Sequence, residues 1–400
     1  MLTRLIEKKR LTAFLFVIFL MLFSAANAKK EFPMLGQALK EWREGSGSFG
    51  KLAEEADSVI EENVLGKRTL TDFYGYIQLL LDKEEESDFE VVKDTEGKLH
   101  YTYFADGTGD TSKLADRVAV LAGELKEEGC ELLYVMPPDK FLVGHTQFSR
   151  GLPYHMANET ADEFLDRLEK EGVRVLDLRD DLAESGLEMS EVFYNTDHHW
   201  RIETAFWAAS RFCDWMGETY GEKMDPDGYY KDPEHYNFVT YKDVYLGSMG
   251  RKTGRFYAEV DDFTLIFPKF NTNYRYENLT SDWEFTGRFE EVLVASSVLW
   301  ESWNAYETDL YSAYLYGNPG FSHIGNMDNP DGIRICMIKD SFAMPFASFV
   351  SLRCGSVDLI DPRAFEGDYA ETLAEGEYDY VVLMFSPQNL TDDFFPFGME

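Results

Sequence analysis

Closely spaced cysteine pairs are missing from this 400-residue sequence. Its four cysteines, Cys130, Cys213, Cys336 and Cys354, include no C-x-x-C pair, which excludes zinc-ribbon and thioredoxin-like sites. Cys336 lies in an apolar, strand-like run, and Cys213 follows Phe212 on an expected helix. We therefore expect buried free thiols, and the sequence indicates no particular disulfide pairing.

Positive charge is scarce, because 38 Lys and Arg residues stand against 73 Asp and Glu residues, which gives a net charge of −35. Residues 1–28 contribute +3, so the remainder carries −38. Nucleic acids and anionic membrane surfaces repel a protein of this charge. Neutral or cationic glycans and small acyl donors remain compatible partners. The apolar fraction of 44% and the aromatic fraction of 15% exclude a disordered chain and indicate a packed globular protein.

The N-terminus has the order of a secretory signal. Four basic residues within positions 4–10 precede the apolar run Leu11–Phe23, and Ala26-Asn27-Ala28 follows as a small-x-small site. This order predicts a signal peptide over residues 1–28. The run is short for a membrane span of about 20 residues, which favours cleavage over an uncleaved anchor. The rest of the chain is expected outside the cytoplasm, secreted or at the cell surface, and membrane-anchored if cleavage does not occur.

The rest of the sequence predicts an α/β domain with an insertion. Residues 29–70 carry apolar side chains at helical spacings and are expected to form an N-terminal helical segment. Residues 71–400 alternate short apolar strands with helices, which predicts a mainly parallel sheet flanked by helices on both faces. Residues 218–330 break this rhythm. Their aromatic, loop-rich composition predicts a β-rich insertion, either a sugar-facing surface or a small core of its own.

Individual elements follow from hydrophobic period and turn residues. Residues 85–104 are expected to form a hairpin that turns at 94–97. We expect helices at 112–128, 160–171, 201–216, 342–351 and 364–373. Strands are expected at 131–136, 173–178, 255–260, 263–267, 333–338, 356–361 and 378–385.

Two of only seven histidines stand together in Thr196-Asp197-His198-His199-Trp200. A helix is expected to follow from Arg201, with Thr196 or Asp197 as its N-cap. Asp197 and His199 are two residues apart at a loop-to-helix junction, so both side chains can face one site. The carboxylate can accept from one ring nitrogen and leave the other to take a proton, as in a Ser-His-Asp triad. An N-cap followed by two surface histidines also explains these residues, so the assignment needs a nucleophile elsewhere.

Ser341 is the candidate nucleophile. Lys339-Asp340-Ser341 ends an apolar strand and begins a helix, where reactive groups collect in parallel sheets. Backbone N–H groups of the helix start can stabilise an oxyanion there. His199, oriented by Asp197, is the candidate base. A metal site on Asp197, His198 and His199 is not expected, because adjacent helical positions point about 100° apart and no H-x-x-x-H spacing accompanies them.

The five residues 196–200 resemble the signature of DHHW proteins, which are similar to the alginate O-acetyltransferases of the AlgX and AlgJ type with an SGNH-hydrolase-like domain. Further stretches agree with the resemblance, which extends over roughly residues 60–390; they are 73–75, 137–140, 339–342 and 361–363. The resemblance implies Ser341 as nucleophile, His199 as base and Asp197 as the orienting carboxylate. The Asp-x-His pair precedes the serine, whereas ordinary SGNH hydrolases have the serine first.

The resemblance also implies an SGNH-hydrolase-like fold and an exported enzyme that transfers acetyl through Ser341 to a cell-surface or secreted polysaccharide. Its expected partners are that polysaccharide, an acetyl donor and a membrane-bound acetyl-transfer protein, with no cofactor, no metal and no nucleic acid. Arg363, His198 and Asn389 are expected near the substrate, and no Gly-containing block supplies a second oxyanion donor. A carbohydrate acetylesterase and a non-catalytic glycan-binding or assembly protein are the alternatives.

Overall fold

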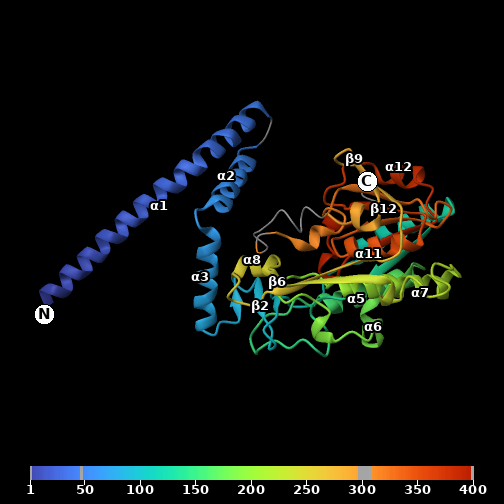
Figure 1. Cartoon of the computed structure of the whole chain (residues 1–400), viewed down its shortest axis with the longest axis horizontal. Helices are drawn as coiled ribbons and strands as arrows, with labels where there is room; N and C mark the ends of the chain where they lie inside the picture. The colour runs from blue at the N-terminus through green and yellow to red at the C-terminus, as the bar shows by residue number, and fades with distance from the viewer. Residues whose placement is uncertain (1, 46–47, 296–305, 307, 398–400) are drawn as a thin grey trace. The chain divides into compact units, whose positions relative to one another are not determined.

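The computed structural model describes residues 2–45, 48–295, 306 and 308–397 (Figure 1). The chain divides into two compact units, Met1–Ile77 and Gln78–Glu400. The described part of the first unit is helical, and the second unit combines a large sheet with helices. The candidate site residues all lie in the second unit.

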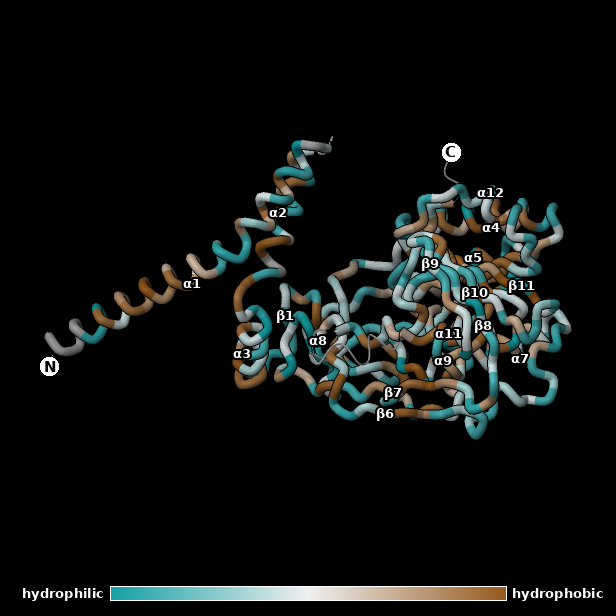
Figure 2. Tube along the Cα trace, turned by 45° about the horizontal axis from the view of Figure 1, so that its top comes forward, coloured by the Kyte–Doolittle hydropathy of each residue, from teal (hydrophilic) through white to brown (hydrophobic). Residues whose placement is uncertain are grey.

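The first unit contains α1 (Leu2–Glu44), α2 (Phe49–Asn63) and most of α3 (Lys67–Leu80), which continues past the unit boundary. Apolar residues form a long brown band along α1 in Figure 2. Within α1, Lys8–Arg43 is long and apolar enough to cross a membrane. A signal sequence near an N-terminus has the same properties, so α1 is compatible with a signal segment or with an anchor.

Among the described residues of the second unit, eight strands form one sheet in the order β5-β4-β13-β11-β12-β10-β8-β9. The strands from β5 to β12 in this order are parallel, and β10, β8 and β9 continue the sheet antiparallel, so the predicted mainly parallel sheet is confirmed. Because β4 pairs with β13, early and late parts of this unit meet in the sheet, where green-blue and red ribbons adjoin in Figure 1. The bounds are β4 Glu131–Met136, β5 Arg174–Asp177, β8 Tyr274–Asn278, β9 Trp283–Gly287, β10 Phe321–Asn326, β11 Arg334–Lys339, β12 Ser356–Ile360 and β13 Tyr380–Met384.

Alternating residues of the parallel strands face two separate cores. On β4, Leu133 and Val135 belong to the core that includes α7 and α11, whereas Leu132 and Tyr134 belong to the core that includes α4 and α5. This alternation follows from the two-residue period of a strand, and continuous apolar runs indicate burial on both faces. The helices are α4 Ser112–Glu127, α5 Ala157–Lys170, α6 Leu178–Asp181, α7 Ile202–Tyr220, α8 Ser248–Thr253, α9 Phe289–Val292, α11 Ala343–Val350 and α12 Tyr369–Glu375.

Two smaller sheets complete the described part of the second unit. Strands β1 (Glu85–Glu86), β2 (Val91–Lys93) and β3 (Leu99–Tyr101) contain the predicted hairpin. Strands β6 (Tyr236–Tyr245) and β7 (Asp261–Pro268) pair antiparallel. Residues 218–330 are therefore strand-rich where described, but β8, β9 and β10 belong to the main sheet.

The predicted N-cap of α7 is wrong. Arg201, with extended backbone angles, occupies the cap position, and neither Thr196 nor Asp197 does. The physical reason is that the Asp197 carboxylate accepts from the His199 ring and its backbone N–H, which bends the chain before the helix begins. The segment therefore forms a loop that carries two histidines.

One other local prediction is wrong, and a second misplaces the start of a helix. Residues 255–260 do not form a strand, because Tyr257 N–H bonds Gly254 O at 3.0 Å in a turn that buries the Tyr257 ring. The helix predicted at 364–373 begins later, as α12, because Asp368 caps it by accepting from the N–H of its third residue. The spacing of apolar residues predicts neither the turn at Tyr257 nor the N-cap at Asp368.

All four cysteines are buried and free, as predicted. Burial raises the pKa of both Cys130 and Cys213 to about 11. These thiols therefore stay protonated at neutral pH and are poor nucleophiles.

Candidate active site

Asp197, His199 and Ser341 form one hydrogen-bonded chain. Ser341 follows β11 closely, and the loop before α7 places His199 Nε2 at 2.6 Å from Ser341 Oγ. His199 Nδ1 lies 3.0 Å from Asp197 Oδ1. The relative exposures are 8% for Ser341, 5% for His199 and 1% for Asp197, so these three side chains are shielded from bulk water. The structure thus brings together the three residues that the sequence analysis combined.

The loop that carries Asp197 and His199 is closed on itself. Phe193 and Trp200 form an isolated antiparallel bridge at its base. Tyr194 N–H also donates to His199 O at 3.3 Å. A short loop fixed at both ends holds the Asp197 and His199 side chains in one orientation. Both side chains face one site, as expected from residues two positions apart.

Asp197 is buried and accepts several hydrogen bonds. Its Oδ2 accepts from Tyr245 Oη–H and from Ser248 N–H, the latter at 3.2 Å, while Oδ1 faces His199. Burial alone raises the pKa of Asp197, but the charges of His199 and His198 lower it more, so its pKa lies well below the usual range. Asp197 is therefore an anion at neutral pH, as a carboxylate that orients an imidazole must be.

His199 is held flat against an aromatic ring. The Tyr311 ring stacks on it with a centroid distance of 3.9 Å and an interplanar angle of 8°. Trp200 Nε1–H donates to Tyr311 Oη at 3.0 Å and fixes that ring in turn. Burial and the charge of His198 lower the pKa of His199, while Asp197 opposes them. His199 is therefore neutral at pH 7 and able to accept a proton.

His198 lies at the exposed edge of this group. Its side chain is 36% exposed, and Nδ1 lies 3.0 Å from Asp197 Oδ1 and 3.1 Å from Ser248 Oγ. The centroid of its ring lies 5.8 Å from the centroid of the Tyr101 ring. Asp197, His198 and His199 each direct one possible metal-ligand atom into a common region. Both ring nitrogens of His199 already have protein partners, however, which suits proton transfer better than ligation.

Asp340 organises the backbone around Ser341. Its Oδ1 accepts from Phe342 N–H at 2.9 Å, and its Oδ2 accepts from Ser386 N–H at 2.7 Å. Asn389, predicted as a substrate-side donor, donates its amide to Asp340 Oδ2 at 2.8 Å. Asn389 therefore joins the loop after β13 to the turn that carries Ser341.

The backbone donors differ from the predicted helix-start set. Phe342 N–H bonds Asp340 Oδ1, and Ala343 N–H bonds Asp340 O at 3.3 Å, so both are already engaged. Within the described residues, Ser341 N–H has no acceptor. One backbone donor next to the nucleophile is thus left for an oxyanion.

Arg363 lies in a separate group of charges. Its guanidinium forms two hydrogen bonds to Asp361, at 2.9 and 2.6 Å, and lies over the ring of Phe394. Asp361 also accepts from buried Lys339 at 3.4 Å. Lys339 is two residues before Ser341 in sequence, but these hydrogen bonds do not extend to Asp197 or His199. The Arg363 side chain is 43% exposed, so one face is open to solvent.

Several residues around the candidate site were not predicted as site residues from the sequence. Tyr245 and Tyr311 come from the region predicted as an insertion, in a chain with 23 tyrosines and no motif around either. Lys140 and Asp261 both bond the backbone just before His199. Lys140 belongs to the stretch 137–140 noted above, and that was its only signal.

The main sheet is mainly parallel and is covered by helices on both faces. A serine follows one of its strands, and an Asp-x-His pair lies on another loop. This is the arrangement of an SGNH-hydrolase-like domain. Sequence comparison agrees, because residues 101–233 match the family described as "ALGX: SGNH hydrolase-like domain, acetyltransferase AlgX". The match includes Asp197 and His199 but ends before Ser341. A comparison with curated protein sequences gives no match.

Solved structures confirm the fold. Bacillus cereus PatB1 is 18% identical, with a TM-score of 0.61 over 77% of this chain and 99% of PatB1. A DHHW family protein from Eubacterium siraeum is 16% identical, with a TM-score of 0.56 over 79% of this chain and 97% of that protein. The predicted resemblance to DHHW proteins and to AlgX is therefore confirmed, and the fold is that of an SGNH-hydrolase-like domain.

Proposed function

We propose that this protein is an exported, serine-dependent O-acetyltransferase that modifies a cell-surface or secreted polysaccharide through an acetyl-Ser341 intermediate. The observation that carries the proposal is the buried contact between Ser341 Oγ and His199 Nε2 at 2.6 Å, continued by His199 Nδ1 and Asp197. The match to acetyltransferase AlgX supports acetyl as the transferred group.

The first half-reaction acylates the serine. Ser341 Oγ attacks the acetyl carbonyl of the donor, and His199 Nε2 takes the hydroxyl proton. The donor's leaving group departs with that proton when the tetrahedral intermediate collapses. Asp197 keeps the Nδ1 proton of His199 in place and stabilises the imidazolium. The free Ser341 N–H is the candidate donor to the oxyanion.

The second half-reaction transfers the acetyl group. A sugar hydroxyl approaches acetyl-Ser341, and His199 takes its proton while the sugar oxygen attacks the carbonyl. The intermediate collapses, Ser341 leaves as alkoxide and receives the proton from His199. The product is a sugar O-acetyl ester and the enzyme is regenerated, with no cofactor required.

Exposed aromatic residues that continue the chain from Tyr101 are a candidate surface for a sugar acceptor. Tyr101 lies beside His198, and the next aromatic residues along the extended chain, Tyr103 and Phe104, are 57% and 67% exposed. Flat apolar rings suit the C–H faces of sugar rings. The aromatic residues of 218–330 contribute less than expected, since many are fully buried: Tyr236, Tyr245, Tyr257, Tyr274, Tyr276, Tyr311 and Tyr314.

The N-terminal sequence is the basis for proposing that the protein is exported. The apolar stretch of α1 is compatible with a signal segment or an anchor, and basic residues precede it. The charge of −38 without residues 1–28 makes an anionic polymer an unfavourable acceptor and a neutral or cationic glycan a favourable one. A membrane-bound acetyl-transfer protein would be a suitable source of acetyl groups outside the cytoplasm.

The test follows acetyl release from a chromogenic acetate ester by the purified full chain, alone and with neutral or amino-sugar oligosaccharides. We expect acetylated oligosaccharide as the main product from wild type and none from Ser341→Ala. Release only to water would favour the acetylesterase, which uses the same triad. A folded wild type without any turnover on several donors would favour a non-catalytic glycan-binding protein.

The candidate acceptor surface has its own test. Tyr103→Ala should raise the KM for the oligosaccharide while the rate of Ser341 acylation stays unchanged. Phe285→Ala on β9 removes another ring that is 45% exposed and serves as the matched control. An unchanged oligosaccharide KM in Tyr103→Ala would remove this surface from the acceptor site.

A further inference from the structure

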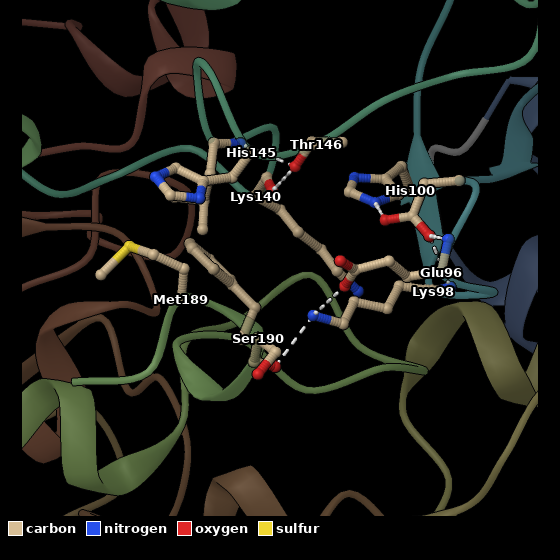
Figure 3. Close-up of a pocket in the computed structure, with 11 residues that line it drawn as sticks. Glu96, Lys98, His100, Lys140, His145, Thr146, Met189 and Ser190 are labelled. Carbon is tan, nitrogen blue, oxygen red and sulfur yellow. Dashed lines mark hydrogen bonds and ion pairs between the residues drawn. The ribbon is translucent and has the colours of Figure 1, made fainter.

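A small cavity borders the loop that carries the catalytic pair. It has a volume of about 70 Å³, and Lys140, Lys98 and Phe193 are among the residues that line it. Figure 3 shows Lys140 and Lys98 entering the cavity from different segments, with Lys98 reaching across to Ser190. The two lysines share this cavity, but only Lys140 bonds the catalytic loop.

Lys140 donates to two backbone carbonyls of that loop. Its Nζ lies 3.0 Å from Asn195 O and 2.6 Å from Asp197 O, and the residue is only 5% exposed. Burial lowers the pKa of Lys140 to about 7, although Asp261 and Asp197 favour its charged form. An amine and an ammonium both have enough N–H groups for two carbonyls, so this contact does not depend on charge.

Asp261 accepts hydrogen bonds from the backbone amides of Asn195 and Thr196 in the same loop. Its carboxylate accepts from Asn195 N–H at 2.5 Å, from Thr196 N–H at 2.8 Å and from Thr196 Oγ1–H at 2.6 Å. Asp261 is 1% exposed. Of the three residues before His198, Asn195 and Asp197 therefore have carbonyls held by a buried lysine, and Asn195 and Thr196 have amides held by a buried carboxylate.

A third contact closes this loop from the other side. Gly247 N–H donates to Thr196 Oγ1 at 2.8 Å. A Cβ placed on Gly247 would lie 2.2 Å from Asp197 Cβ, so any larger residue there would displace Asp197. The backbone of Asp197 thus has little freedom to shift.

We propose that Lys140 and Asp261 are positioning residues that hold the backbone of Asn195–Asp197, and thereby set the direction from which His199 meets Ser341. The inference rests on the proposed function, since it assumes that His199 activates Ser341. Buried ionisable groups are expensive to desolvate and seldom add net stability over apolar replacements. Their value here is geometric, because a displacement of about 1 Å at a reacting group can lower a rate by about a hundredfold.

The test measures covalent labelling of Ser341 by a small aryl sulfonyl fluoride, which needs neither the natural donor nor the acceptor. Ser341 Oγ forms a bond to sulfur, the S–F bond breaks, fluoride leaves, and His199 takes the serine proton. Lys140→Met, Lys140→Gln and Asp261→Asn are compared with wild type in the full chain. Lys98→Met is the matched control, because Lys98 lines the same cavity but donates to Ser190 O at 2.8 Å.

We expect the maximal labelling rate constant to fall by about tenfold to a hundredfold in Lys140→Met and Asp261→Asn, with the half-saturating reagent concentration unchanged. Lys140→Gln, which retains amide N–H donors, should recover part of the rate, and Lys98→Met should label as wild type does. A merely structural role would lower the melting temperature and leave the labelling rate of the folded protein unchanged.

Three results would overturn the proposal. One is wild-type labelling in a folded Lys140→Met variant, and another is an equal loss of rate in Lys98→Met. Failure of all three test variants to fold would show that these residues support the whole domain rather than the loop. If instead folded wild type is never labelled at Ser341, the proposed function itself fails, which is a distinguishable result.

Discussion

Ser341 Oγ lies 2.6 Å from His199 Nε2, although 142 positions separate the two residues in the chain. The contact depends on β11 and on the loop before α7, two elements that contribute to the same apolar core. Because both side chains are buried, the hydroxyl–imidazole pair is shielded from competing water. In the proposed mechanism, such a pair acts as one unit.

Removing either member of the pair should therefore cost as much as removing both. We expect Ser341→Ala, His199→Ala and the double variant each to lower kcat/KM for a chromogenic acetate ester by about 10⁴-fold or more. Ser348→Ala is the control, since Ser348 is also buried and its hydroxyl donates to Met344 O at 3.0 Å, in its own helix. Additive losses in the double variant would show that the two residues act separately.

Tyr245 should affect activity through its hydrogen bond to Asp197. Its hydroxyl donates to Asp197 Oδ2 inside the protein, and a hydrogen bond to a charged group is worth about 1.5 kcal/mol or more. Tyr245→Phe should lower kcat/KM about tenfold, since 1.36 kcal/mol corresponds to a factor of ten. Tyr314→Phe loses a buried hydroxyl that bonds Ile266, away from the site, and should keep the wild-type kcat/KM. Equal activities of the two variants would contradict the role of Tyr245.

The pH dependence of activity should follow His199. Burial and the charge of His198 lower its pKa from the ordinary value of 6.5, and the neutral imidazole is the reactive form. The kcat/KM should therefore rise with pH to a plateau through a midpoint below 6.5. His198→Gln removes one of the groups that lower this pKa, so its midpoint should lie at higher pH than that of wild type. A midpoint that moves down, or does not move, would contradict this electrostatic coupling.

A second histidine should influence stability rather than activity. His323 on β10 faces Asp358 on β12 across an antiparallel pair, and their side chains are hydrogen-bonded. Burial lowers the pKa of His323, but the bond and charge of Asp358 raise it more, so the net shift is upward. A raised folded-state pKa gives stability that is full below the unfolded value of about 6.5 and is lost as pH rises through the folded value.

His323→Gln should therefore lower the free energy of unfolding by more at pH 5.5 than at pH 9. Urea titrations of both proteins at the two pH values give this difference directly. The kcat/KM for the acetate ester should not change, because within the described part of the chain His323 contacts neither Ser341 nor His199. A loss of stability that is equal at both pH values would show that the ion pair contributes nothing.

The hydrogen-bonded group of Asp197, His199 and Ser341 could be predicted from the sequence because each part carries its own signal. Asp197 and His199 belong to a segment with two adjacent histidines, in a chain with only seven. Ser341 lies between a strand and a helix that the apolar pattern predicts. The predicted strands at 131–136 and 333–338 correspond to β4 and β11. Apolar runs and turn residues are local properties, so they are visible without the fold.

The supporting residues could not be predicted because their roles arise only from tertiary contacts. Tyr245 and Tyr311 reach Asp197 and His199 from distant segments, and neither spacing nor composition distinguishes them from other tyrosines. The hydrogen bond from Asn389 to Asp340 was likewise not predicted, since it forms only because the loop after β13 returns to the Ser341 turn. The order of strands in the sheet likewise has no local signal.

The most direct test of the account is the intact mass of the full chain after brief exposure to an activated acetate ester, quenched in acid. Peptide mapping then locates the added group. The account predicts one acetyl group on Ser341 in wild type and none at that position in Ser341→Ala, with a slower rise in His199→Ala. A folded wild type that turns over the ester with no acetyl on Ser341, or with acetyl on another residue required for turnover, would contradict it.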